Sequence, residues 1–204
     1  MALEYHAIYI NLDHRTDRKE SIEGVLDSLQ IPTDRRHRFP AVHHSNGWIG
    51  CTQSHCAVIE KAKQEGWPAV LVFEDDFSLT VKPEEFHGAV LEAQKFPHDV
   101  LLCAYHVEAS EEVPGTTGVR RAFSAQAPSA YIVHSHFYDR LLENYRAAVA
   151  GALAGGNHWD FINDQYWKGL QADRSTMWLY CTPRLGIQKA GYSDLARAHV
   201  DYKV

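Results

Sequence analysis

The feature that most constrains this chain is an apolar run that ends in three consecutive acidic residues, at positions 69–76. Its first five residues are apolar and rich in β-branched and aromatic types, which predicts a strand buried on both faces. In open α/β sheets, ligands bind outside the carboxyl ends of such strands. Adjacent carboxylates repel one another, and a divalent cation with oxygen ligands relieves that repulsion. The alternative is an acidic, solvated turn, and this run alone leaves both interpretations open.

Composition narrows the class of protein. The chain has 204 residues, of which 45% are hydrophobic and 23% charged, as in ordinary globular proteins, so we predict a single domain over residues 1–204. The net charge of -6 and the lack of a basic run argue against a nucleic-acid partner. No apolar run approaches the ~20 residues that cross a bilayer, so at most peripheral membrane contact is expected.

The cysteines carry no sequence signature of a metal site. Cys51, Cys56, Cys103 and Cys181 lack the paired spacing of zinc ligands. Because no signal peptide precedes them, we expect reduced structural thiols and a cytoplasmic location.

Strand-like and helix-like segments alternate through the first half, which predicts a mixed, mainly parallel α/β sheet with flanking helices. Asp17 is a candidate cap for the first helix. We expect strands at 6–12, 35–42, 69–73 and 100–104, helices at 18–29, 51–65 and from Pro83, and a loop at 47–50.

The second half is less regular. Residues 105–118 have little apolar periodicity and contain glycines and a proline, which predicts an exposed, mobile loop. We expect strands at 119–123, 129–134 and 178–181, helices at 137–150 and 159–170, a flexible break at 151–156, and an irregular tail past Gly191.

The turn after the first strand has neither a dinucleotide-binding nor a P-loop fingerprint. It offers Asn11 at the strand end, and Arg15 and Arg18 at the start of a helix. Guanidinium groups bind phosphate in a bidentate manner, and a helix N-terminus adds positive potential. The alternative is that both arginines pair with Asp13 and Asp17 at the surface.

An ordered set of motifs resembles glycosyltransferase family 25, the bacterial lipooligosaccharide β-galactosyltransferases and the procollagen galactosyltransferases. No single motif is specific, but the set runs in the family's order over nearly the whole chain. The matching blocks are residues 9–18, 38–42, 50–55, 71–76, 129–133 and 183–194.

The resemblance implies a GT-A-like (Rossmann-like) fold and a metal-dependent, inverting hexosyltransferase. Its donor would be a UDP-sugar such as UDP-galactose or UDP-glucose, its acceptor a saccharide or other hydroxyl compound, as in lipopolysaccharide biosynthesis, and its cofactor Mn²⁺ or Mg²⁺. Residues 1–104 would then be the nucleotide-sugar-binding half, and residues 105–204 the acceptor-side half.

The resemblance also implies roles for individual residues. Asp76 would ligate the metal directly, Glu74 would support it there or at the ribose, and His199 is a candidate further ligand. His55 could instead be a structural helix residue, and Ser129 and Tyr131 could belong to a plain core strand. The residues expected to bind the nucleotide sugar are Asn11, Arg15, Arg18, Ser54, His55, Glu74, Asp75, Ser129, Tyr131 and Gln188.

Inverting transfer requires a base for the acceptor hydroxyl. Asp160 and Asp164 are spaced i,i+4, so one helix would place both on the same face. The family carries an Asp after a hydrophobic residue in this region, and Trp159 followed by Asp160 matches that pattern. We therefore prefer Asp160 as base or acceptor-binding residue, with Asp164 second and a helix cap as the alternative for Asp160.

The chain departs from the family at Trp48, where a Glu is common two residues before the Gly-Cys pair. This departure favours an altered donor preference or reduced activity. Two rival functions follow. One is a catalytically silent, sugar-nucleotide-binding family member, and the other is a metal-dependent sugar-nucleotide hydrolase or nucleotidyltransferase.

Overall fold

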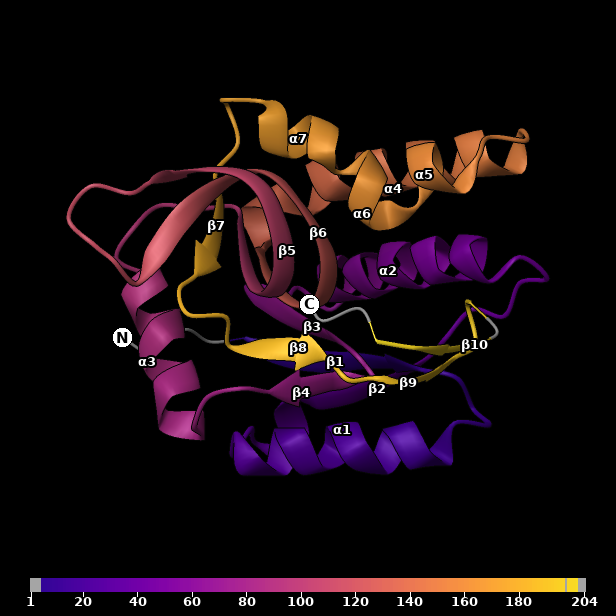
Figure 1. The fold of residues 1–204 in the computed structure, drawn as a ribbon, viewed down its shortest axis with the longest axis horizontal. Helices are drawn as coiled ribbons and strands as arrows, with labels where there is room; N and C mark the ends of the chain where they lie inside the picture. The colour runs from indigo at the N-terminus through magenta and orange to yellow at the C-terminus, as the bar shows by residue number, and fades with distance from the viewer. Residues whose placement is uncertain (1–4, 197, 202–204) are drawn as a thin grey trace.

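A six-stranded sheet forms the centre of the computed structural model, which describes residues 5–196 and 198–201. The strand order is β2-β1-β3-β6-β5-β7, and only β6 runs against the direction of the others (Figure 1). The predicted mixed, mainly parallel sheet is therefore confirmed. The strands are β1 (His6–Asn11), β2 (Arg36–Pro40), β3 (Ala69–Glu74), β5 (Val100–Glu112), β6 (Val119–His134) and β7 (Trp178–Cys181).

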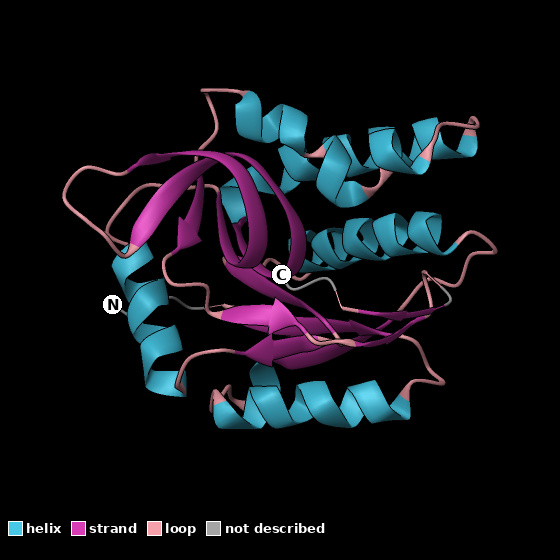
Figure 2. Ribbon diagram, viewed as in Figure 1, coloured by secondary structure: helices cyan, strands magenta, loops and turns pink. Residues whose placement is uncertain are grey.

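Helices cover both faces of the sheet (Figure 2). One face carries α1 (Thr16–Ser28) and α3 (Pro83–Ala93), and the other carries α2 (Gly47–Gln64) and α4 (Tyr138–Leu153). Three short helices follow α4, namely α5 (His158–Phe161), α6 (Asn163–Tyr166) and α7 (Lys168–Ala172).

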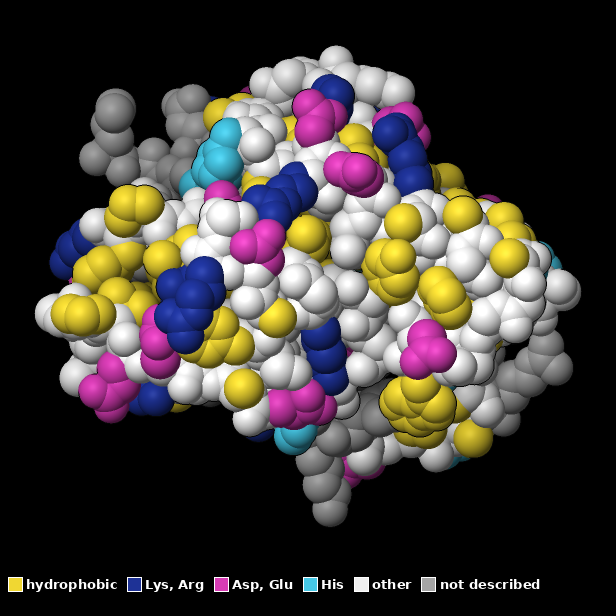
Figure 3. All heavy atoms as spheres, turned by 90° about the horizontal axis from the view of Figure 1, so that it is seen from above, with side chains coloured by type: hydrophobic (Ala, Val, Ile, Leu, Met, Phe, Trp, Pro, Cys, Tyr) yellow, Lys and Arg dark blue, Asp and Glu magenta, His cyan; other side chains and the backbone are white. Residues whose placement is uncertain are grey.

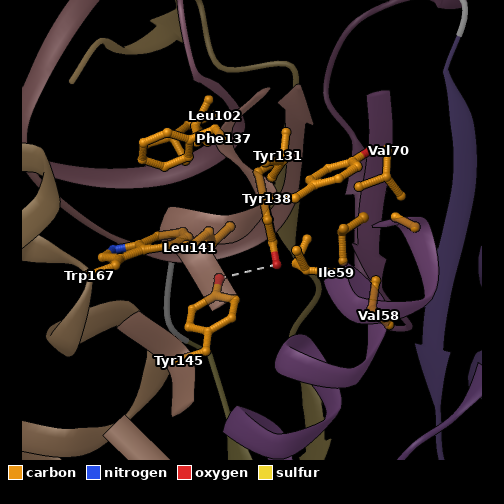
Figure 4. Packing of buried hydrophobic residues seen from close by; sticks show 14 of the residues in the cluster. Val58, Ile59, Val70, Leu102, Tyr131, Phe137, Tyr138, Leu141, Tyr145 and Trp167 are labelled. Atoms are coloured by element: carbon orange, nitrogen blue, oxygen red, sulfur yellow. Dashed lines mark hydrogen bonds between the residues drawn. The ribbon is translucent and has the colours of Figure 1, made fainter. Parts of the chain in front are cut away.

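The core divides into two clusters because successive strand residues point to opposite faces. In β3, Val70 and Val72 pack on the α2 side, whereas Leu71 and Phe73 pack on the α1 side. Figure 4 shows Val70 beside residues of α2 and near the ring of Tyr138. A strand buried on both faces reads as one continuous apolar run, as the sequence predicted.

Helix α2 begins at Gly47, so the predicted loop at 47–50 is wrong. Gly50 does not break the helix. A Cβ there would lie 2.5 Å from the carbonyl oxygen of Val42, so glycine permits a close approach of the segment after β2. Helix α1 begins at Thr16, which places Asp17 in its first turn rather than at its cap.

The predicted loop at 105–118 is also wrong over most of its length. β5 continues to Glu112 and pairs with β6, which is one long strand where two were expected. Beyond Tyr105 most of β5 is exposed, so backbone pairing rather than apolar burial maintains it. That is why apolar periodicity gave no signal there. Figure 1 shows the pair curling over the sheet.

Residues 159–170 are not one helix. Ile162 has extended backbone angles of φ -69° and ψ 147°, which separate α5 from α6. Asp160 and Asp164 therefore lie on different helices, and the shared face predicted from their i,i+4 spacing is wrong.

The C-terminal segment returns to the start of the chain. β8 (Gly186–Gln188) pairs with β4 (Phe77–Leu79), and β9 (Gly191–Ser193) pairs with β10 (Ala198–Val200). The irregular tail expected past Gly191 is thus partly a strand pair, and residues 202–204 lie outside the described residues.

The surface seen in Figure 3 carries Lys and Arg side chains beside Asp and Glu side chains rather than in a continuous basic patch. Within residues 5–196 and 198–201, every helix is too short or too polar to cross a membrane.

We expect Leu71→Ala to lower the free energy of unfolding by about 2–5 kcal/mol, because it leaves a cavity under a fully buried side chain. Urea denaturation measures the loss. Leu153→Ala is the matched control, since Leu153 is 59% exposed and should change stability by less than about 0.5 kcal/mol. Equal effects of both variants would contradict the burial of β3.

Candidate functional site

A cavity of about 600 Å³ opens at the carboxyl ends of the parallel strands β1, β2 and β3. Its walls come from the first half of α2, residues 126–128 of β6, the α5–α6 region and the C-terminal segment from Gln188 to Leu195. Among the predicted site residues, those that line it are Asn11, Arg18, Ser54, His55, Glu74, Asp75, Asp76, Asp164 and Gln188.

Arg18 ties α1 to the acidic end of β3. Its Nη1 donates to Asp75 Oδ1 at 2.9 Å and to Asp76 Oδ2 at 3.0 Å. Asn11 Nδ2 donates to Asp75 Oδ2 at 2.8 Å, and Gln188 Nε2 donates to Asp76 Oδ2 at 3.0 Å. Side chains from β1, α1 and β8 therefore hold the two carboxylates in place.

The charge of this cluster is not fully compensated. Burial, with Glu74 close by, raises the pKa of Asp76 to about 7, and burial also raises the pKa of Asp75. Asp76 Oδ1 is buried and has no hydrogen-bond partner. Burying a carboxylate oxygen without a hydrogen-bond donor is unusual and costs free energy. A divalent cation that takes oxygen ligands would remove this cost by binding the oxygen. The residues present thus fit a metal ion at Asp76.

Glu74 faces a different neighbour. Its Oε1 lies 3.2 Å from His55 Nε2, and His55 Nδ1 lies 2.7 Å from the Tyr131 hydroxyl. Cys51 stands one helical turn before His55 on α2, and the ligand atoms of Cys51, His55 and Glu74 all lie within 4.8 Å of one another. These three residues could hold a metal ion.

The two candidate bases differ in position. Asp164 lines the cavity, and its Oδ2 accepts from the backbone N–H of Ala127 at 2.8 Å. Burial, followed by the charge of Glu74, raises the pKa of Asp164. Asp160 is exposed, is hydrogen-bonded to the Asn157 side chain, and stands outside the cavity lining.

Ala127 has a positive φ of 56°, which is uncommon for a residue with a side chain. The hydrogen bond from its N–H to Asp164 helps to hold this backbone conformation. The strain therefore lies at the cavity wall, in contact with a candidate catalytic carboxylate.

Four further predicted residues lie in the described part of the chain but do not line the cavity: Arg15, Ser129, Tyr131 and His199. Arg15, the residue before α1, pairs with Asp17 and, across to the C-terminal segment, with Asp194. His199 is exposed on β10, with its ring 5.7 Å from that of Tyr192.

The other two belong to the strand core. Tyr131 is fully buried, and Ser129 is buried with its hydroxyl unpartnered. Ser54 lines the cavity, but its hydroxyl donates to the Gly50 carbonyl and accepts from the Val42 N–H.

The lining residues that the sequence did not predict include Cys51 and Asn163. Cys51 was assigned only a structural thiol, although its i,i+4 spacing to His55 on a predicted helix was a visible signal. Asn163, whose Oδ1 lies 3.9 Å from Cys51 Sγ, had no signal, because only the break at Ile162 turns it toward α2.

The raised pKa of Asp76 has a consequence for stability. Its folded value of about 7 exceeds the unfolded value of ~3.9, so between these pH values the folded chain binds more protons. The contribution of Asp76 to the free energy of unfolding is fully present below about pH 4. It is lost as the pH rises toward 7, by at most about 1.4 kcal/mol per pH unit.

We therefore expect the free energy of unfolding in urea, taken at pH 7 minus pH 5, to be more negative in the wild-type chain than in Asp76→Asn. Asp139→Asn is the control, because Asp139 is on the surface with 78% of its side chain exposed. An unchanged pH slope in Asp76→Asn would contradict the assignment of this proton to Asp76.

Residues 36–129 match the model of glycosyltransferase family 25 (LPS biosynthesis protein). This match confirms the resemblance found in the sequence over that segment. It implies sugar transfer as the class of activity. No curated protein matches the chain.

One solved structure shares the fold. The crystal structure of mannose-1-phosphate geranyltransferase from Thermus thermophilus superposes with a TM-score of 0.51 at 10% identity, covering 91% of this chain and 74% of that one. With the sheet order above, this likeness confirms the predicted GT-A-like class.

Two further matches are weaker. A nucleoside-diphosphate-sugar pyrophosphorylase from Vibrio cholerae has a TM-score of 0.43 at 15% identity, covering 85% of this chain and 70% of that one. A197 from STIV has a TM-score of 0.47 at 9% identity, covering 98% of this chain and 100% of that one.

Proposed function

We propose that this chain, which matches glycosyltransferase family 25 over residues 36–129, transfers galactose or glucose from a UDP-sugar to a hydroxyl group of a saccharide or glycoconjugate, with inversion. The observation that carries the proposal is the Arg18–Asp75–Asp76 cluster, with one free buried carboxylate oxygen, in a cavity of about 600 Å³. A cavity of that size suits a nucleotide sugar.

At the donor end, Asp76 would hold Mn²⁺ or Mg²⁺ through Oδ1. These ions commonly bind proteins through one or two carboxylates and take their remaining ligands from water and substrate phosphates. When bound, the metal would neutralise the negative charge that develops on the departing UDP. Arg18 fixes both aspartates, and its charge reduces their repulsion of the diphosphate.

At the acceptor end, Asp164 is the better base. Its carboxylate lines the cavity, and a pKa raised by burial brings it closer to the working pH of a general base. Asp164 takes the proton of the acceptor hydroxyl as that oxygen bonds to the anomeric carbon. The bond from that carbon to the UDP oxygen breaks, and its electron pair leaves with UDP.

Trp159 supports a saccharide acceptor. It lines the cavity with 71% of its surface exposed, and an indole ring offers a flat apolar face to a sugar ring. The ring of its neighbour His158 contacts the rings of Trp159 and Trp48, at centroid distances of 5.0 and 5.5 Å. Trp48, the departure from the family pattern, thus belongs to the same aromatic group.

Calorimetry with UDP tests the donor end. We expect Mn²⁺ to strengthen UDP binding at least tenfold, and Asp76→Asn to abolish that gain, because the amide is a poorer metal ligand. Asp139→Asn should bind as the wild type does. Equal UDP affinity with and without Mn²⁺ in the wild-type chain would contradict metal-assisted binding.

A UDP-release assay over a panel of acceptor sugars tests the chemistry. Asp164→Asn should lower kcat about 10²–10⁴-fold while keeping UDP affinity, because it removes the base and not the donor site. Asp160→Asn should have a small effect, and the reverse ranking would make Asp160 the base. Release that needs no acceptor would indicate a hydrolase, and UDP binding without release would indicate a silent family member.

A further inference from the structure

We propose that Cys51, His55 and Glu74 form a binding site for a thiophilic divalent cation, with Zn²⁺ as the best match. The site lies in the cavity wall, beside the Asp75–Asp76 cluster and separate from the oxygen ligand at Asp76. It does not depend on sugar transfer, since it concerns the affinity of the free chain for the metal alone.

The three ligand atoms are already gathered. Cys51 and His55 are spaced i,i+4 on α2, so both side chains leave the same helix face, and Glu74 stands at the end of β3 opposite them. His55 Nε2 and Glu74 Oε1 are 3.2 Å apart, and Cys51 Sγ lies within 4.8 Å of a ring nitrogen of His55 and of a carboxylate oxygen of Glu74. Metal binding would need only small side-chain movements.

The surroundings of His55 resemble those of a metal-binding imidazole. Such a histidine donates its other ring N–H to a polar group, which fixes the ring orientation. Here Nδ1 is 2.7 Å from the Tyr131 hydroxyl, which is 3.3 Å from the Tyr145 hydroxyl (Figure 4). The Tyr131 hydroxyl can accept from Nδ1–H and donate to Tyr145, which leaves the Nε2 lone pair for a metal.

Proton balance follows from this arrangement. The imidazole stays neutral, since its proton moves from Nε2 to Nδ1 while the Tyr131 proton turns toward Tyr145. The Cys51 thiol loses its proton to solvent and binds as thiolate. No oxidant or other reactant takes part.

The chemistry of the donors selects the metal. A set of one sulfur, one nitrogen and one oxygen suits Zn²⁺, whereas Mg²⁺ and Mn²⁺ prefer oxygen ligands such as Asp76. Three protein ligands leave a fourth tetrahedral position, as in open zinc sites. The cavity side of the cluster provides room for water or a substrate atom there.

A nucleophilic role for Cys51 fits less well. Burial, reinforced by nearby carboxylates, raises the pKa of its thiol well above the usual value. Both nitrogens of His55 already contact Tyr131 and Glu74, so the imidazole is not placed as a base for the thiol.

Cobalt substitution tests the site directly. We expect the reduced, chelator-treated chain to bind one Co²⁺ with a thiolate-to-cobalt charge-transfer band and intense tetrahedral d–d bands, and Zn²⁺ to displace it. Cys51→Ser should lose the charge-transfer band. Cys56→Ser should keep it, because Cys56 is on the same helix but outside the cavity lining. Tyr131→Phe should weaken Zn²⁺ binding about 10–100-fold against a chromophoric chelator.

The band's absence from the wild-type chain, or its persistence in Cys51→Ser, would overturn the proposal. Circular dichroism checks that each variant folds. If Cys51→Ser does not fold, His55→Gln repeats the test by removing a different ligand of the proposed site. Asp76→Asn separates this proposal from the proposed function. It should retain the cobalt charge-transfer band while losing Mn²⁺-dependent UDP binding, so the two can fail independently.

Discussion

The contact between Arg18 and the two aspartates at the end of β3 is the interaction on which the rest of the site depends. One guanidinium faces a pair of carboxylates, with a third acidic residue, Glu74, nearby. Neutral donors from Asn11 and Gln188 supply hydrogen bonds but no charge. Burying unpaired charge is costly, and a partly neutralised cluster keeps an affinity for cations. Arg18 holds α1, and Gln188 holds β8, at the end of β3, so the acidic cluster connects three elements of the fold.

Much of the fold was predictable because buried strands and helices have characteristic patterns of apolar residues in the sequence. β1 and β3 are apolar on both faces, and amphipathic helices follow at the expected spacing. The β5–β6 extension was missed because paired but exposed strands need no apolar pattern. The start of α2 was missed because Gly50 serves a close approach to Val42, and sequence alone cannot distinguish that role from a helix break.

The part of the site at the ends of β1 and β3 was more predictable than the part formed by α5 and α6, and the reason is geometric. Asn11 and Asp75 follow parallel strands, whose carboxyl ends must meet at one edge of the sheet. Asp160 and Asp164 depend instead on where a helix breaks. Extended angles at Ile162 turn one carboxylate into the cavity and leave the other in solvent, and no local rule distinguishes that break from a continuous helix.

The return of the C-terminal segment has a consequence for folding kinetics. Arg18 donates to the carbonyl of Tyr192 across a sequence separation of 174 residues, and Gln188 reaches Asp76 across 112. Contacts between such distant residues require large loops to close, and a high contact order slows folding. The C-terminal wall of the cavity therefore depends on the closure of large loops, a step that contacts between neighbouring elements of the chain do not require.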